Sequence, residues 1–294
     1  MFSRKKIVVT HSGDFHADDA FAVATLSLLH RGKIRVVRSR RPEDWSKGDY
    51  VVDVGDVYDH SARRYDHHQR GGAGVRVDGV PYAAFGLVWK HYGEIVAGGK
   101  ETALRVERVL VEPLDAGDNG YAIAIPKIAV REYAVADAIS AFRGTRVGAC
   151  AEYDDFMCAV HWAQNILSRE IARCALLVSD TKKARAVYEQ SPNKQIIVFD
   201  TDLFWTDALR STPDALFAVY PDSIGQWRVK TVQEDGFVAR RDLPASWAGL
   251  RGDALVEATG VPDAVFAHTK RFMAVAQSKE GALALAKKAL ETRE

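Results

Sequence analysis

Three short apolar runs and one helix-length segment make up half of the first 54 residues, and their order restricts the fold more than any other feature of the chain. The apolar runs cover residues 7–10, 34–37 and 50–54, and the segment at 18–31 has a helical composition and is followed by Gly32. A strand, a helix and further strands in this order predict a parallel sheet with crossover helices. We therefore expect an α/β fold.

Two of these predicted strands lead into side chains that can bind a metal ion. His11 comes directly after the first strand, and Asp53 lies near the end of the third. In open α/β sheets, ligands bind at the carboxyl ends of the strands. We therefore expect His11 and Asp53 to belong to a functional site at that edge of the sheet.

The rest of the chain predicts two domains, residues 1–190 and residues 191–294. In the first domain, residues 85–96 and 102–114 have helical patterns, and an amphipathic stretch from Phe156 to about residue 188 is long enough to connect two lobes. The second domain is expected to be a smaller α/β domain. Its predicted strands are residues 196–199, 216–220, 227–232, 264–267 and 272–275, and its predicted helices are residues 250–258 and 279–290.

Composition excludes several classes of protein. Hydrophobic residues make up 47% of the chain and charged residues 27%, so the chain should fold rather than remain disordered. Forty basic and 39 acidic residues leave a net charge of +1, so any contact with nucleic acid must come from a local basic patch. No apolar run approaches the ~20 residues that a membrane span requires, and we expect no membrane partner.

The compartment is inferred from the start of the chain and from its cysteines. The first residues lack the apolar core of a signal peptide, and the three cysteines are an odd number without zinc-type spacing. Both features favour reduced thiols in the cytoplasm. The sequence leaves the oligomeric state open, including a homodimer.

Imidazole and carboxylate side chains are concentrated in a few short motifs of the first domain. Such a mixed set suits Mn²⁺, Fe²⁺, Co²⁺ or Zn²⁺, whereas purely oxygen sites favour Mg²⁺. Two close metal ions can clamp both the attacking and the leaving oxygen of a phosphoryl group. The sequence therefore predicts metal-assisted hydrolysis. The candidate ligands are His11, His16, Asp18, Asp53, His67 and Asp115.

Each of these motifs is weak by itself, and the simpler alternatives differ from residue to residue. An aspartate at the end of a strand often caps the next helix, as Asp53 could. Asp14 and Asp19 are expected to be solvated or to cap a helix rather than to bind a metal. Only the conjunction of the motifs, in this order along the chain, favours a metal site.

Basic side chains that could contact a substrate lie in both domains. His268, Lys270 and Arg271 fall within four residues at a predicted strand end, and Arg70 follows the Asp66-His67-His68 motif. The planar guanidinium of arginine can bond two phosphate oxygens at once. The alternative for residues 268–271 is a solvated turn.

The motifs resemble those of the melanocyte-proliferating-gene family, whose members have also been called metal-dependent protein hydrolases. This family is related to the DHH phosphoesterases, which include RecJ-type exonucleases and family II inorganic pyrophosphatases. The resemblance covers nearly the whole chain. It is carried by residues 11–20 (HSGDFHADDA), 52–55 (VDVG), 65–70 (YDHHQR), 115–120 (DAGDNG), 227–229 (WRV), 243–251 (LPASWAGLR), 260–262 (GVP) and 266–268 (FAH).

The resemblance implies a two-lobed enzyme. Its first lobe would be a DHH-type parallel-sheet domain with helices on both faces that holds the metals, and its second lobe would contact the substrate. By analogy with the pyrophosphatases, His11, His16 and Asp53 would hold one metal ion. Asp18, Asp53, His67 and Asp115 would hold the other, with Asp53 as the bridge.

The resemblance also implies roles for the two remaining residues of the Asp-His-His motif. His68 would be free to contact the phosphate or to donate a proton, and Asp66 would orient the histidines. Pyrophosphatases have an aspartate where His16 stands. The additional imidazole favours softer ions, so two Mn²⁺ ions are the first choice, with Mg²⁺, Co²⁺, Fe²⁺ or Zn²⁺ as alternatives.

The activity that follows is that of a metal-dependent phosphodiesterase acting on RNA or short oligonucleotides. The resemblance implies a 3′–5′ exonuclease. Two alternatives stay open. The near-neutral charge favours a phosphatase or pyrophosphatase that acts on a small molecule, since a long polyanion track should show surplus basic residues. The other alternative is a metal-stabilised nucleotide-binding protein without catalysis.

Overall fold

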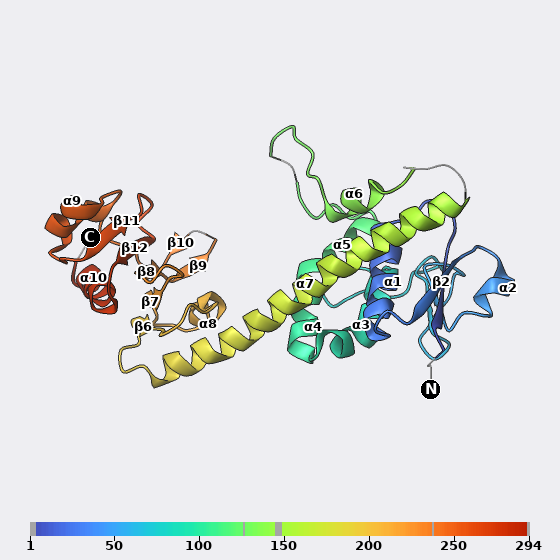
Figure 1. The fold of residues 1–294 in the computed structure, drawn as a ribbon, viewed down its shortest axis with the longest axis horizontal. Coiled ribbons are helices and arrows are strands. Elements are labelled where there is room, and N and C mark those ends of the chain that lie inside the picture. The colour runs from blue at the N-terminus through green and yellow to red at the C-terminus, as the bar shows by residue number, and fades with distance from the viewer. Residues whose placement is uncertain (1–3, 126, 145–148, 237, 293–294) are drawn as a thin grey trace. The chain divides into compact units, whose positions relative to one another are not determined.

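The computed structural model describes residues 4–125, 127–144, 149–236 and 238–292 (Figure 1). Contacts between residues group the chain into two compact units, Met1–Ala175 and Leu176–Glu294. The long helix α7 (Ala149–Gln190) runs through this division. The domain boundary expected after residue 190 is the C-terminal end of the same helix.

The sheet of the first unit has five strands in the order β2-β1-β3-β5-β4. β1 pairs in parallel with β2 and β3, β3 pairs in parallel with β5, and β4 is antiparallel to β5. The prediction of a mainly parallel sheet is therefore confirmed. The strands are β1 (Lys6–Thr10), β2 (Ile34–Arg38), β3 (Tyr50–Val52), β4 (Tyr58–Asp59) and β5 (Arg64–Tyr65).

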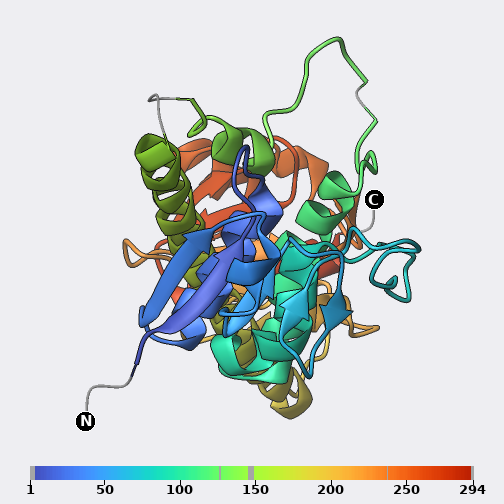
Figure 2. The same cartoon turned by 90° about the vertical axis from the view of Figure 1, so that its right-hand side faces the viewer.

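Helices cover the two faces of this sheet very unequally. One face carries the main core, in which Phe21 of α1 packs on Phe85 of α3. The first half of α7 adds Phe156 to the same core (Figures 1 and 2). On the other face, Trp45 packs on a small cluster that includes Val9. The helices are α1 (Ala17–Leu29), α2 (Pro42–Trp45), α3 (Ala84–Ala97), α4 (Lys100–Val106), a π-helical turn at Glu107–Val111, α5 (Glu112–Asp118) and α6 (Val135–Ser140).

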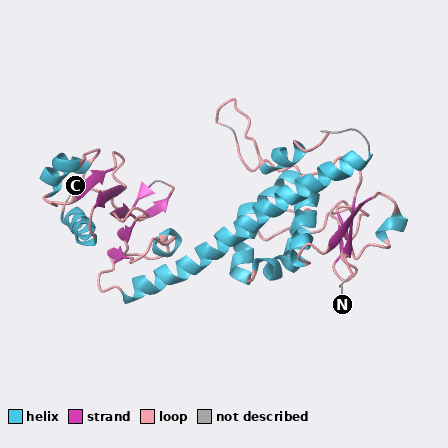
Figure 3. Cartoon of the chain, viewed as in Figure 1, coloured by secondary structure: helices cyan, strands magenta, loops and turns pink. Residues whose placement is uncertain are grey.

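The second unit is a smaller α/β unit, as predicted, and contains both helices and strands (Figure 3). Its main sheet has five strands in the order β11-β12-β8-β7-β6. Only β6 and β7 pair in parallel. Helices α9 and α10 pack on one core, while α8 and the last turns of α7 pack on another. The elements are β6 (Ile196–Val198), α8 (Thr206–Arg210), β7 (Phe217–Pro221), β8 (Trp227–Thr231), β9 (Gln233–Asp235), β10 (Val238–Ala239), a 3₁₀ turn at Ala245–Trp247, α9 (Gly252–Thr259), β11 (Ala264–Ala267), β12 (Met273–Ala276) and α10 (Lys279–Glu291).

Among the described residues, no helix is both long enough and apolar enough to cross a membrane.

Candidate metal centre

Three motifs follow the carboxyl ends of three adjacent parallel strands. His11 comes directly after β1, Asp53 directly after β3, and Asp66-His67-His68 directly after β5. Because β1, β3 and β5 are neighbours in the sheet, these side chains meet at one edge. The topology therefore brings together residues that are far apart in the sequence.

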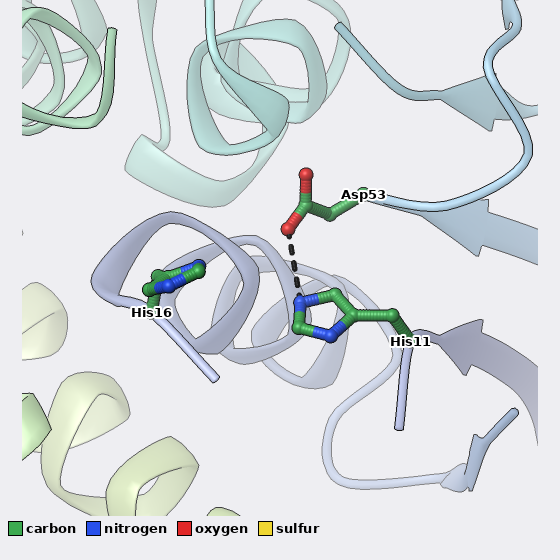
Figure 4. Close-up of side chains that lie close together, drawn as sticks. All are labelled: His11, His16 and Asp53. Carbon is green, nitrogen blue, oxygen red and sulfur yellow. Dashed lines mark ion pairs between the residues drawn. The ribbon is translucent and has the colours of Figure 1, made fainter. Parts of the chain in front are cut away.

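The first motif joins β1 to the N-terminus of α1. His16 is the N-cap residue of this helix, and its backbone N–H donates to Oδ1 of Asp19 over 2.9 Å. Asp18 lies in the first turn, where the positive end of the helix dipole favours a carboxylate. The ring centroids of His11 and His16 are 6.1 Å apart (Figure 4).

Asp53 occupies the centre of the cluster. Its φ of +54° is in the left-handed region, which aspartate tolerates better than most residues, and its N–H donates to the carbonyl of Tyr65 over 3.0 Å. Its Oδ2 lies 3.2 Å from Nε2 of His11 (Figure 4). Its Oδ1 lies 3.5 Å from Nε2 of His67 and 3.5 Å from Nδ1 of His68. The left-handed turn thus aims one carboxylate at three imidazoles.

Asp66 holds His68 rather than His67. Its Oδ1 accepts hydrogen bonds from Nδ1 of His68 over 2.7 Å and from the His68 backbone N–H over 3.1 Å. Its Oδ2 accepts from the N–H of Asp56. With Nδ1 engaged, the half-exposed ring of His68 keeps Nε2 available for a ligand.

His67 faces carboxylates from two helices. Its Nε2 lies 3.2 Å from Oδ2 of Asp118, at the end of α5, and 4.0 Å from Oδ2 of Asp18 in α1. Among the described residues, three groups of side chains could each hold a metal ion, since the ligand atoms within a group lie within 4.8 Å of one another, and Asp53 belongs to two of the groups. They are His11, His16 and Asp53; Asp53, His67 and His68; and His16, Asp18 and Asp118.

Buried polar atoms without partners show that this cluster fits divalent cations. Both carboxylate oxygens of Asp18, Oδ1 of Asp53 and Nε2 of His67 are buried without a hydrogen-bond partner in the described part of the chain. Buried polar atoms are nearly always satisfied, and unpaired buried charge is costly. Burial, and then the charges of Asp53, Asp118 and Asp19, raise the pKa of Asp18 well above its usual value. A divalent cation bound among these carboxylates would give the buried oxygens a partner and would offset the repulsion between the negative charges.

Without a metal ion, the carboxylates of this cluster stabilise the protonated form of the neighbouring imidazoles. Burial lowers the pKa of His11, but Asp19 and Asp53 outweigh it and raise that pKa to about 9. Burial also lowers the pKa of His67, whereas Asp118 and Asp53 raise it to about 10. Metal ligands must be deprotonated, so metal binding at this cluster should release protons.

Asp19 has a second contact that the sequence did not indicate. Besides capping α1 as predicted, it places Oδ2 3.2 Å from Nε2 of His11. The side chain is fully buried, and that Oδ2 has no hydrogen-bond partner among the described residues. Asp19 therefore adds a negative charge beside the first imidazole.

The predicted ligand Asp115 is not a member of the potential metal-binding groups found among the described residues. The Oδ2 atom of this fully buried residue accepts from Nη2 of Arg76 over 2.7 Å, and Oδ1 accepts from the N–H of Gly86 over 3.0 Å. The carboxylate lies so close to Gly86 that a Cβ there would clash. Asp118, one helical turn further along α5, reaches His67 instead. Asp118 belongs to the same sequence motif, and residues three apart share a helix face, so the motif alone does not distinguish the two aspartates.

Two cavities open on the cluster, and His16, Asp53 and His68 line both. The larger has a volume of about 540 Å³ and is also lined by Asp118 and Arg143. The smaller, of about 330 Å³, is also lined by His11, Arg40, Trp45 and Asp66. Both cavities therefore give a ligand access to the shared residues.

The predicted substrate-binding residues are not among the described residues that line the two cavities at the metal cluster. Arg70 is exposed and is not among the described residues that line either cavity. In the second unit, Nδ1 of His268 accepts from the N–H of Lys270, and Arg271 donates to Asp242 over 2.6 Å. Arg271 also lines a cavity of about 670 Å³ within that unit, together with Arg240 and Arg241.

Comparisons with known proteins identify the family. Residues 7–290 match the MYG1_exonuc family, described as uncharacterised protein family UPF0160. The chain is 30% identical to a human protein named MYG1 exonuclease, over 99% of this chain and 89% of that protein. It is 31% identical to a MYG1 protein of Saccharomyces cerevisiae, over 97% and 96% of the two chains. A structure of RecJ from Thermus thermophilus, 13% identical, matches 98% of this chain and 50% of that one with a TM-score of 0.31, too low to bear on the fold.

The resemblance inferred from the motifs is thus confirmed over nearly the whole sequence, and the chain belongs to the MYG1 family.

Proposed function

We propose that this protein is a metal-dependent phosphodiesterase that hydrolyses RNA or short oligonucleotides from the 3′ end. The observation that carries the proposal is the convergence of four imidazoles and three carboxylates beside two cavities, with buried oxygens that have no hydrogen-bond partner among the described residues. The human relative is named MYG1 exonuclease, which supports a nucleic acid substrate for this chain as well. Mn²⁺ is the proposed metal, because the set contains imidazoles as well as carboxylates.

The proposed ligands divide into two sets that share Asp53. His11, His16 and Asp53 would hold one ion. The other ion would lie between Asp53 and His67, with the carboxylates of Asp18 and Asp118 completing its ligands. When bound, such ions supply a nucleophilic water at neutral pH and neutralise charge on phosphoryl oxygens.

His68 is the proposed general acid. Asp66 fixes the half-exposed ring through Nδ1, and Nε2 of this ring can donate a proton to the leaving oxygen. We expect His68→Gln to lower kcat by about 10²-fold or more, since general acid catalysis contributes about 10²–10⁴-fold. Steady-state kinetics with measured Mn²⁺ content test this. An unchanged kcat in the metal-loaded variant would exclude the role.

The proposed activity is tested with four substrates in the presence of Mn²⁺. A single-stranded RNA labelled at either end, a dinucleotide, a nucleoside 5′-monophosphate and pyrophosphate are incubated with the protein. We expect the 3′-labelled RNA to release labelled mononucleotide first, while the 5′-labelled RNA shortens step by step. An Asp53→Asn protein, purified in parallel, controls for contaminating nuclease.

The same assay separates the alternatives. Hydrolysis of pyrophosphate or the monophosphate, with the RNA left intact, would support the small-molecule phosphatase. Tight nucleotide binding without hydrolysis of any of the four would support a non-catalytic nucleotide-binding protein. A cytoplasmic location and a homodimer stay predictions.

A further inference from the structure

The larger cavity at the metal cluster is lined by a positively charged side chain, Arg143, to which the proposed function assigns no role. Arg143 follows α6 and lines this cavity together with His67 and Asp118. Among the described residues that line the cavity, Arg143 is the only lysine or arginine. The same cavity is lined by several of the imidazoles and carboxylates proposed to hold metal ions, together with neutral residues such as Asn119 and Ser140.

Arg143 differs from a typical structural arginine in the hydrogen bonding of its Nε atom within the described part of the chain. Its Nε is buried and has no hydrogen-bond partner among the residues that the structure describes. The guanidinium carbon lies 5.8 Å from the ring centroid of Phe15, next to His16 in the sequence. By contrast, the buried Arg76 bonds to the carboxylates of Asp115 and Glu107. A buried N–H that is left unpaired is costly, so the donor of Arg143 indicates a missing acceptor.

The helix α6, which precedes Arg143, packs on helices that carry proposed metal ligands. Ile139 of α6 is fully buried in the main core, and α6 contacts both α1 and α5. Those two helices carry Asp18 and Asp118. The helix that precedes Arg143 therefore packs, within one unit, on the two helices that carry these proposed metal ligands.

We infer that Arg143 binds a non-bridging phosphate oxygen of a nucleotide substrate inside this cavity, and this inference rests on the proposed function. Metal ions at the cluster would face the phosphoryl group from one side, which leaves oxygens for a second cation. A guanidinium presents paired N–H donors that match two phosphate oxygens. The first unit would then contain a phosphate-binding residue of its own, in addition to the basic residues of the second unit.

Four proteins loaded with Mn²⁺ test the assignment: wild type, Arg143→Gln, Arg143→Lys and the control Arg35→Gln. Arg35 lies exposed on β2 of the same unit, so its replacement removes the same charge outside the cavity. Mn²⁺ content, melting temperature, binding of 5′-AMP by calorimetry and RNA hydrolysis are measured for each. We expect Arg143→Gln to bind 5′-AMP at least about 10-fold more weakly and to lose about 10²-fold in kcat/KM, as for other donors to a developing oxyanion.

We expect Arg143→Lys to recover part of the lost 5′-AMP affinity and kcat/KM, because lysine keeps the positive charge but lacks the planar guanidinium. The control Arg35→Gln should behave as wild type. Arg143→Gln with 5′-AMP affinity and turnover within twofold of wild type would overturn the assignment. Loss of metal or of folded structure in both Arg143 variants would also overturn it, since the role would then be structural.

The experiment separates this inference from the proposed function. If wild type hydrolyses no RNA but binds 5′-AMP through Arg143, the assignment stands and the proposed function fails. If wild type hydrolyses RNA and Arg143→Gln is unimpaired, the function stands and the assignment fails. If wild type neither binds 5′-AMP nor hydrolyses RNA, both fail.

Discussion

Replacing Asp53 with asparagine is expected to abolish hydrolysis while the protein stays folded. The carboxylate lies within 3.5 Å of nitrogen atoms of His11, His67 and His68, and it belongs to two of the three potential metal-binding groups. Asparagine has the same shape and tolerates the left-handed backbone conformation, but it lacks the charge that bridges two cations. Loss of an outer partner of a metal ligand costs about 10- to 100-fold, so loss of the bridge should lower kcat by at least about 10³-fold.

The matched control for this variant is Asp14→Asn. Asp14 is exposed on the loop between His11 and His16 and is not a member of any of the metal-binding groups found among the described residues. Kinetics, Mn²⁺ content and circular dichroism are compared for the two variants and wild type. The control should keep full activity. A folded Asp53→Asn protein with full activity would refute the bridging role.

Replacing Arg76 with methionine is expected to destabilise the first unit severely. The Arg76 side chain is only 5% exposed, donates to Asp115 and Glu107, and lies 4.1 Å from the ring centroid of Tyr82. Without it, the fully buried carboxylate of Asp115 loses its only cationic partner among the described ion pairs. Removing one member of a buried pair typically costs about 3–5 kcal/mol, and we expect a loss of this size in the free energy of unfolding.

Urea denaturation measures this loss, and the double variant Arg76→Met/Asp115→Leu is its control. Because the second change removes the unpaired carboxylate, the double variant should regain most of the stability. If Arg76→Met lowers the free energy of unfolding by less than about 1 kcal/mol, Arg76 and Asp115 do not stabilise the unit as a buried ion pair, because surface pairs contribute no more than this.

Local sequence patterns predicted the elements that position the site. The strands around residues 7–10 and 34–37 and the helix between them agree with β1, β2 and α1 to within about two residues, because each is long enough for hydrophobic periodicity to show. The pattern did not reveal β4 and β5, since two residues have no periodicity. Their pairing depends on tertiary contacts, yet β5 is what places Asp66-His67-His68 beside Asp53.

The choice between Asp115 and Asp118 shows where sequence reasoning reached its limit. Both aspartates lie in one motif, and Asp118 of this motif lies beside His67 in the structure. Which of them faces His67 depends on Arg76, a partner 39 residues away from Asp115, and on the continuation of the helix to Asp118. Neither follows from local propensity. The unpaired Nε of Arg143 likewise emerges only from three-dimensional packing.

Anomalous diffraction from crystals containing Mn²⁺ tests the central claim most directly. The account predicts two peaks about 3.5–4 Å apart on either side of the Asp53 carboxylate. It further predicts His11 and His16 at one ion, with His67 and Asp118 at the other. At saturating Mn²⁺, the absence of any peak within coordination distance of His11, Asp53 or His67 would contradict the account.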